Sequence, residues 1–386
     1  MRRHLIEERP HWRATAETFG FRFADMYGTK YWDESAMIAF TLEEIERHIE
    51  DPSGDLHQMC LELADRAAAD ERLLARLGIP GAHHAYVAAS WRNRAQEPSL
   101  YGRFDLAYNG TGPAKLLEYN ADTPTGLYEA AVFQWLWLED CVRSGALPPG
   151  TDQFNSIQEH LVERLCLMPQ TSILHVAGAV DNVEDGGTLS YVADCALQAG
   201  FRVKMLAMSD IGLDAQGRFT DLDDLVIDRM FKLHPWEWMF GEAYGEHLAQ
   251  SDCAMMEPPW KAMLSTKAIL PLLWEMFPGH PNLLPAYFED DPRAQGLRDY
   301  ARKPLFSREG ENVTLVRHGR TETVDGPHGA GRFVVQAATP LFQTRHGHVV
   351  IGSWIVGDTP CGIGLREDTS AITMNMSRFI PHIITP

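Results

Sequence analysis

The amino-acid sequence predicts a mixed α/β (α+β) fold, and three of its segments carry that prediction. Residues 172–206 contain two strand-like runs on either side of a helix-like run, the pattern of a βαβ unit. Residues 103–121 contain two strand-like runs joined by NGTGP, the pattern of a β-hairpin. The last hundred residues are rich in strand-like segments. Strands alternating with helices, with added hairpins, are typical of this class.

The first expected elements are two amphipathic helices within residues 35–75. Thr41 should be the N-cap of the first helix, because Glu44 follows it at the spacing of a capping box. The sequence PSG at 52–54 should end that helix. After the predicted hairpin, TPTGLYEAAVFQWLWLEDCVR is expected to form a long, mostly buried helix that begins near Thr123 or Thr125.

The βαβ unit should consist of the strand SILHVAGAV, a helix that ends at Gly200 and the strand RVKMLAM. DLVIDRMFKL is a further predicted strand. KAILPLLWEMF should form an apolar helix that opens at Ser265 and Thr266. GRFVVQAATPLFQ and HVVIGSWIVGD are expected strands joined by TRHG as a second hairpin. The glycine-rich GPHGAGR at 326–332 lacks the Walker pattern, so we expect a loop or hairpin there.

Composition restricts the class of protein. The chain has 386 residues, 34 of them basic and 53 acidic, which gives a formal net charge of −19. This balance argues against nucleic acid or an anionic membrane surface as a partner. No apolar stretch approaches the roughly 20 residues of a membrane helix, and the N-terminus does not resemble a signal peptide. The six cysteines form no CxxC pair, so we expect reduced thiols and a cytoplasmic location.

The densest polar pattern lies on the predicted hairpin. Arg103 and Asp105 should share one strand face, and Glu118 and Asn120 should share the matching face of the other strand. Hard oxygen ligands from two strands suit Mg²⁺, which binds a few carboxylates together with phosphate oxygens and water. Solvated charges at a sheet edge are the other interpretation, and the spacing alone leaves both open.

These residues carry a family resemblance. LYGRFDLAYNGTGPAKLLEYNADTPTGLYEAAVFQWLWLED resembles the glutathionylspermidine synthase family, in particular short synthetase-like members without an amidase domain. The resemblance continues through FKLHPWEWM, EPPWKAMLSTKAILPLLW, RKPLFSREG and DTPCGIGLRED, in the family's order. It implies an ATP-grasp-like fold and an ATP-dependent ligase. In such an enzyme a carboxylate attacks the γ-phosphate, and an amine then attacks the resulting acylphosphate.

The resemblance also implies roles for single residues. The matches to the two-ion Mg²⁺ site are Asp105, Glu118 and Asn120, with Glu118 bridging the ions. Arg103 matches the contact to the transferred phosphate, and Arg366 matches an arginine directed at the γ-phosphate. The nucleotide side is matched by Lys267, Lys303 and Gln336. A mobile loop over the site is matched by Arg308, Glu309 and Gly310. The peptide and amine substrates are matched by Thr123, Thr125, Glu184 and Asp185.

The order of these parts predicts a permuted ATP-grasp topology, because the metal motif precedes Lys267 and Lys303. We expect hairpin and N-terminal helices in 1–170, a pre-ATP-grasp βαβ subdomain in 171–257, and the nucleotide-binding lysines and C-terminal strands in 258–386. Two positions depart from the family pattern. Leu233 replaces a hydroxyl residue, and Arg378 stands where an acid would hold a polyamine, which it should repel.

Three functions follow from these observations. The first is an ATP- and Mg²⁺-dependent ligase that joins a small carboxylate, such as a peptide or thiol-peptide, to an amine. The second is a nucleotide-binding protein of the same fold that has lost ligase activity and serves as a partner-binding module; the altered polyamine position motivates it. The third is a metal-dependent hydrolase using the hairpin carboxylates, which would leave Lys267 and Lys303 unexplained.

Overall fold

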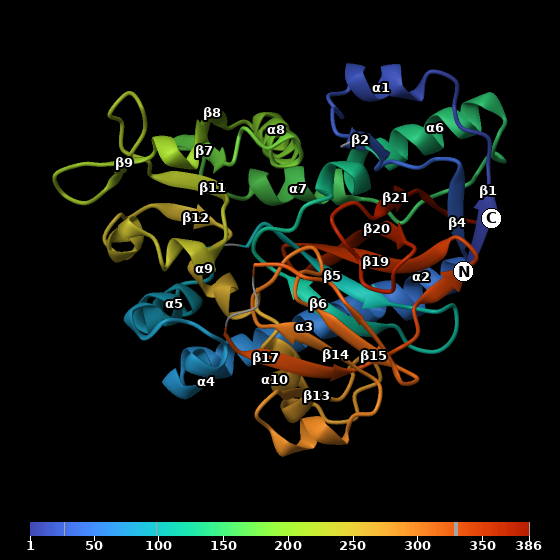
Figure 1. The fold of residues 1–386 in the computed structure, drawn as a ribbon. Coiled ribbons are helices and arrows are strands. Elements are labelled where there is room, and N and C mark those ends of the chain that lie inside the picture. The colour runs from blue at the N-terminus through green and yellow to red at the C-terminus, as the bar shows by residue number, and fades with distance from the viewer. Residues whose placement is uncertain (27, 98, 328–330, 386) are drawn as a thin grey trace.

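Helices and several β-sheets build the protein, which confirms the predicted mixed α/β class (Figure 1). The structure is a computed structural model that describes residues 1–26, 28–97, 99–327 and 331–385. Part of the glycine-rich segment, residues 328–330, therefore lies outside the described residues. Within these ranges, no helix combines the length and the apolar character that crossing a bilayer requires.

The central sheet contains the predicted hairpin. Its strands run in the order β21-β20-β19-β5-β6, and β18 pairs with β19. The two hairpin strands pair antiparallel, as predicted, and strands from the C-terminal part of the chain extend the sheet beside them (Figure 1). The strands are β5 (Tyr101–Ala107), β6 (Lys115–Asn120), β18 (Phe342–Thr344), β19 (Gly347–Val356), β20 (Thr359–Asp368) and β21 (Arg378–Ile380).

A second, parallel sheet contains the predicted βαβ unit. Its order is β12-β11-β7-β8, and α8 connects β7 to β8 and packs on both. Gly200 follows the helix with φ +92°, a conformation that glycine adopts readily at a helix end. The elements are β7 (Ile173–Gly178), α8 (Val183–Gln198), β8 (Arg202–Ala207), β11 (Arg229–Leu233) and β12 (Ala254–Met256).

A third sheet is antiparallel, and α10 (Ile269–Met276) packs on it. GRFVVQAATPLFQ, expected to be one strand, is divided between this sheet and the central one. The chain crosses from β17 to β18 at residues 338–341, where Pro340 has no N–H for a sheet hydrogen bond. In sheet order the strands are β13 (Ala286–Phe288), β17 (Phe333–Ala337), β14 (Tyr300–Pro304), β15 (Thr314–Arg317) and β16 (Arg320–Thr323).

The remaining strands form small sheets. The two ends of the chain lie near each other because β1 and β22 both pair with β4 (Figure 1). These three strands are β1 (Arg2–Leu5), β4 (Ala36–Phe40) and β22 (His382–Ile384). The two-stranded pairs are β2 (Asp25–Met26) with β3 (Thr29–Lys30), and β9 (Gly212–Leu213) with β10 (Phe219–Thr220).

The expected end of the first helix at 52–54 is wrong. Thr41 and Glu44 form the predicted capping box, but the chain stays helical through α2 (Leu42–Ile45), the π-helix η1 (Glu46–Glu50) and α3 (Asp51–Ala68). Pro52 lies in the first turn of α3, directly after the π turn. A proline has no N–H for the i→i−4 hydrogen bond of an α-helix. The wider π turn replaces these bonds just before Pro52, so the proline is tolerated.

The long apolar helix starts later than expected. The chain is helical from Leu127, through η3 (Glu129–Phe133) and α6 (Gln134–Ser144), because Gly126 has φ +80° and cannot belong to a right-handed helix. The other α-helices are α1 (Trp12–Thr18), α4 (Glu71–Arg76), α5 (His84–Arg92), α7 (Ile157–Cys166) and α9 (Trp236–Met239).

Two hydrophobic cores flank the central sheet. One joins α3, α5 and α10 to β5, β6 and β17, and the other joins α6, α7 and α8 to β7 and the N-terminal aromatic residues. The six cysteines are free thiols, and four of them are buried, in agreement with the prediction. The polar face of the hairpin therefore lies between these two cores, and side chains from the elements around both can reach it.

Candidate active site

The hairpin places its polar residues as the sequence predicted. Arg103 lies opposite Asn120 and Asp105 lies opposite Glu118 in the antiparallel register. Arg103 Nε donates to Asp105 Oδ1 at 2.6 Å, and Asn120 Nδ2 donates to Asp105 Oδ2 at 3.1 Å and to Glu118 Oε1 at 3.2 Å. The four side chains are half-buried and form one connected polar face.

Two lysines from distant parts of the chain meet this face. Lys267, just before α10, has its Nζ 3.0 Å from Glu118 Oε2 and donates to Ser307 O at 3.0 Å. Lys303 on β14 donates to the backbone oxygen of Leu117 at 2.9 Å, which attaches the third sheet to β6. The polar hairpin residues and the two lysines therefore lie at one place, as a permuted topology requires.

Burial and charge act against each other in this group. Burial alone would raise the pKa of Glu118, but Lys267 and Lys303 outweigh it and hold that pKa well below its ordinary value. Burial raises the pKa of Asp105, although Arg103 beside it acts in the opposite direction. Burial lowers the pKa of Lys303 to about 8 despite the nearby Glu118. The cluster is thus a set of partly desolvated charges, each of which is stabilised by the opposite charges beside it.

All the predicted site residues line two adjoining cavities. One cavity has apolar walls from the third sheet and also contains Lys267, Lys303 and Gln336. The other is more polar and contains Arg103, Asn120, Thr123, Thr125, Glu184, Asp185, Arg308 and Arg366. Both are lined by Asp105, Glu118, Glu309 and Gly310. The hairpin carboxylates and the 309–310 turn thus lie at the junction of the two cavities.

Gln336 and Arg366 make contacts that their expected roles did not include. Gln336 uses its amide oxygen to accept from Lys303 at 2.9 Å and its amide nitrogen to donate to Leu116 O at 2.8 Å, so it orients the lysine. Arg366 donates to the backbone oxygens of Met374, Asn375 and Ser377 at 2.6–3.2 Å, and so holds the 374–377 loop.

At the start of α8, Glu184 is buried and Asp185 is half-buried, and a third carboxylate that sequence reasoning missed lies near them. Asn182 caps the helix, with its Oδ1 accepting from the backbone of Glu184 and Asp185. Burial and the adjacent Glu184 raise the pKa of Asp185 to about 6. Glu129 is fully buried and accepts from Tyr31 Oη. Its signal was one acid within the otherwise apolar run LYEAAVF.

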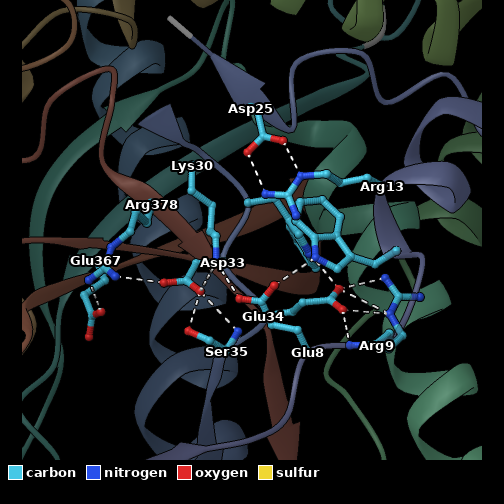
Figure 2. Close-up of polar contacts among 12 residues, drawn as sticks. Glu8, Arg9, Arg13, Asp25, Lys30, Asp33, Glu34, Ser35, Glu367 and Arg378 are labelled. Carbon is cyan, nitrogen blue, oxygen red and sulfur yellow. Dashed lines mark hydrogen bonds and ion pairs between the residues drawn. The ribbon is translucent and has the colours of Figure 1, made fainter. Parts of the chain in front are cut away.

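Arg378 does not act as the sequence suggested. It is paired with Asp33 at 2.8 Å and with Glu367 at 2.6 Å, and Figure 2 shows its side chain among these acids. Of the residues that the structure describes, those lining the two cavities do not include Arg378. The expected repulsion of a cationic amine by Arg378 is therefore wrong, because two carboxylates neutralise its charge away from the cavity.

The hairpin offers oxygen ligands of the kind that a hard metal ion prefers, but only a small number of them. Over the described ranges, no group of three His, Cys, Asp or Glu side chains is placed to hold a metal. Asp105 and Glu118 provide two carboxylates, and Asn120 adds an amide. Mg²⁺ is commonly held by one or two carboxylates with phosphate oxygens and water completing its shell, so this donor set fits it.

Comparison with known proteins identifies the family of the chain. The family model described as glutathionylspermidine synthase preATP-grasp matches residues 3–385. The chain belongs to this family. The resemblance to the glutathionylspermidine synthase family noted in the sequence is thereby confirmed.

Relatives in this family are ligases and synthetases. A Haemophilus influenzae protein with the provisional name acid–amine ligase is 41% identical over 93% of this chain and 92% of that protein. The bifunctional glutathionylspermidine synthetase/amidase of Escherichia coli is 26% identical over 89% of this chain but 58% of its own length. The trypanothione synthetase of Crithidia fasciculata is 28% identical over 82% of this chain and 52% of its own length. The chain thus spans little more than half of the last two proteins.

One solved structure shares the fold. It is a glutathione synthetase-like effector from Globodera pallida, with a TM-score of 0.58, 10% identity and 98% coverage of both chains. This likeness bears on the fold alone, and it agrees with the predicted ATP-grasp-like architecture. The named relatives confirm the expected enzyme class, an ATP-dependent carbon–nitrogen ligase.

Proposed function

We propose that this protein is an ATP- and Mg²⁺-dependent ligase that joins a small carboxylate to an amine through an acylphosphate. One observation carries the proposal. Lys267, Lys303 and the hairpin carboxylates meet at the junction of an apolar-walled cavity and a polar one. A ligase of this kind needs such an arrangement, because the carboxylate must reach the γ-phosphorus of the nucleotide and the amine must then reach the acyl carbon at the same place.

The first cavity is proposed to hold the nucleotide. Its apolar walls, including Val313, Leu315 and Leu341, suit a purine base. Lys267 and Lys303 at its inner end would contact the phosphates, with Gln336 fixing the position of Lys303. Asp105, Glu118 and Asn120 would hold Mg²⁺, which when bound neutralises charge on the phosphates.

The second cavity is proposed to hold the acid and the amine. The carboxylate oxygen attacks the γ-phosphorus as the bond to the β–γ bridging oxygen breaks, which releases ADP and leaves an acylphosphate. The neutral amine then attacks the acyl carbon, loses one proton, and expels phosphate. Arg103 and Arg308 would stabilise the transferring phosphoryl group. Glu184 and Asp185 would bind the amine as a cation, and one of them could accept its proton.

The residues that line the second cavity, together with the named relatives, support a substrate class. Thr123 and Thr125 support a peptide or thiol-peptide as the acid, as do relatives whose names include glutathionylspermidine. Leu233 lines the second cavity and offers no hydroxyl. We also propose a cytoplasmic location, which the free thiols support.

The test measures ADP release with a panel of small acids and amines at saturating ATP and Mg²⁺. We expect release that requires both an acid and an amine. Lys303→Ala should weaken ATP binding at least tenfold by calorimetry, because it removes a buried cation from the phosphate end. Lys115→Ala is the matched control, because that lysine lies on β6, lines neither cavity and donates to Pro281 O. Equal nucleotide affinity in both variants would contradict the assignment.

A second function remains a candidate because Leu233 alters the substrate cavity. A nucleotide-binding protein of this fold that lacks ligase activity would bind ATP tightly and release no ADP with any member of the panel. It would then act as a partner-binding module. The same experiment separates the two functions, because both predict ATP binding and only the ligase predicts turnover.

A further inference from the structure

The 307–310 turn lies over the junction of the two cavities, and its backbone is unusual. Glu309 has φ +53° and Gly310 has φ +73°, so two successive residues adopt the left-handed conformation. The backbone N–H of Glu311 donates to Arg308 O at 2.9 Å and closes the turn. Something outside the turn must keep it in place for Arg308 to face the second cavity.

Lys267 Nζ reaches the turn from outside by donating to Ser307 O at 3.0 Å, and Arg308 makes a further outside contact through its guanidinium. Nη2 donates to Glu237 Oε1 at 2.9 Å, and Nη1 donates to Thr123 Oγ1 at 3.2 Å. The guanidinium carbon also lies 5.0 Å from the centre of the Trp238 ring. Thr123 belongs to the substrate segment after β6, whereas Glu237 and Trp238 belong to α9. One arginine thus connects three segments around the cavity.

The α9 segment is well suited to be a fixed anchor. Trp236 is fully buried, its backbone N–H donates to Asp122 Oδ2 at 2.8 Å, and its indole donates to Glu257 O at 3.1 Å. Glu237 follows directly and is therefore held on a rigid base. Its carboxylate is 20% exposed and the Arg308 side chain is 36% exposed, so water screens the pair only in part.

We propose that Glu237 is a positioning residue for Arg308, and that it holds the 307–310 turn closed over the cavity junction. This inference rests on the proposed ligase function and adds to it a residue that sequence analysis missed. The two-point contact with Glu237 and Thr123 restricts the long arginine side chain before substrates bind. Such preorganisation places the guanidinium where phosphoryl charge develops.

The first test needs no substrate. Hydrogen exchange of residues 306–313 is compared between the wild-type chain, Glu237→Gln and Glu242→Gln. Glu242 is the matched control, because it follows α9 and bonds a different side chain, His234, at 2.9 Å. We expect exchange about fivefold faster in Glu237→Gln and unchanged in Glu242→Gln. Glu237→Asp should recover part of the protection because it keeps the charge. Unchanged exchange in Glu237→Gln would overturn the proposal.

The second test measures acid- and amine-dependent ADP release. We expect kcat to fall about fivefold in Glu237→Gln while the KM for ATP changes less than about twofold, because Lys267 and Lys303 are untouched. In an Arg308→Ala background, Glu237→Gln should have no further effect on kcat. A full additional loss there would refute a role through Arg308. If the wild-type chain shows no turnover, the ligase function fails, yet the exchange comparison still decides whether Glu237 holds the turn.

Discussion

At the residue scale, desolvation governs the behaviour of single charges in this site. Glu118 stays ionised in a half-buried position because Lys267 and Lys303 are close to it. Glu129 is fully buried and Glu184 adds a second negative charge nearby, and these effects raise its pKa to about 7. The carboxyl Oε2 of Glu129 has no hydrogen-bond partner among the described residues. Two acids of the same type therefore differ in charge at neutral pH because their neighbours differ.

The raised pKa of Glu129 predicts a pH-dependent cost to stability. Its pKa is about 7 in the folded chain and 4.5 ordinarily, so the folded state binds the proton more tightly and loses stability as the pH rises between these values. Glu129→Gln removes that cost and keeps an acceptor for Tyr31. Chemical denaturation should find it more stable than wild type by on the order of 2–3 kcal/mol at pH 8, with little difference near pH 4.5.

Glu139→Gln is the control for this comparison, because Glu139 is exposed on the same helix. It should change the free energy of unfolding little at either pH. A stability difference for Glu129→Gln that is the same at pH 5 and pH 8 would show that Glu129 in the folded chain is already ionised at pH 5, and would contradict a raised pKa.

At the element scale, local conformation decides where side chains can go. Gly126 has φ +80°, so the following helix starts at Leu127 and leaves Thr123 and Thr125 outside it, where both line the second cavity. Pro52 is accommodated by the π turn before it. Capping and hairpin signals were correctly read from the sequence because they depend on adjacent residues. The π turn was not, because long-range packing supports it.

The 307–310 turn gives a prediction at this scale. A Cβ on Gly310 would lie 2.6 Å from Thr373 O, whereas a Cβ on Gly279 would meet nothing within 4 Å, and the two glycines have similar positive φ. Gly279→Ala should lower the free energy of unfolding by about 1 kcal/mol through backbone strain alone. Gly310→Ala should also reduce ADP release about tenfold or more, because the clash displaces the turn. Equal activity in the two variants would contradict the claim that the position of the 307–310 turn controls ADP release.

At the scale of the whole molecule, the site lies where separate sheets meet. The hairpin lies on the central sheet, Lys303 on the third sheet, and Glu184 and Asp185 next to the parallel sheet (Figure 1). A fully buried ion pair joins two of these bodies. Asp122 Oδ1, just after β6, is 2.6 Å from Nζ of Lys232 on β11. The pair therefore keeps the parallel sheet against the hairpin.

Breaking this pair should destabilise the fold more than removing both charges. Lys232→Met leaves Asp122 buried without its cation and should cost about 3–5 kcal/mol of unfolding free energy. The double variant Asp122→Asn with Lys232→Met should recover a substantial part of that loss. Arg47→Met, which breaks an exposed pair with Glu43, should leave the denaturation midpoint nearly unchanged. Additive losses in the double variant would show that the two residues act independently.

The sequence by itself determined the local elements and, through its motifs, the family. The hairpin, the βαβ unit and the capping box follow from residues close together in the chain, and so does the shared face of Arg103 and Asp105. Only the tertiary structure decided that Arg378 is neutralised by Asp33 and Glu367, that Glu129 is buried near the acidic pair, and that Glu237 meets Arg308. Such contacts join segments tens to hundreds of residues apart. They depend on how the sheets and cores pack together, and no local pattern encodes that.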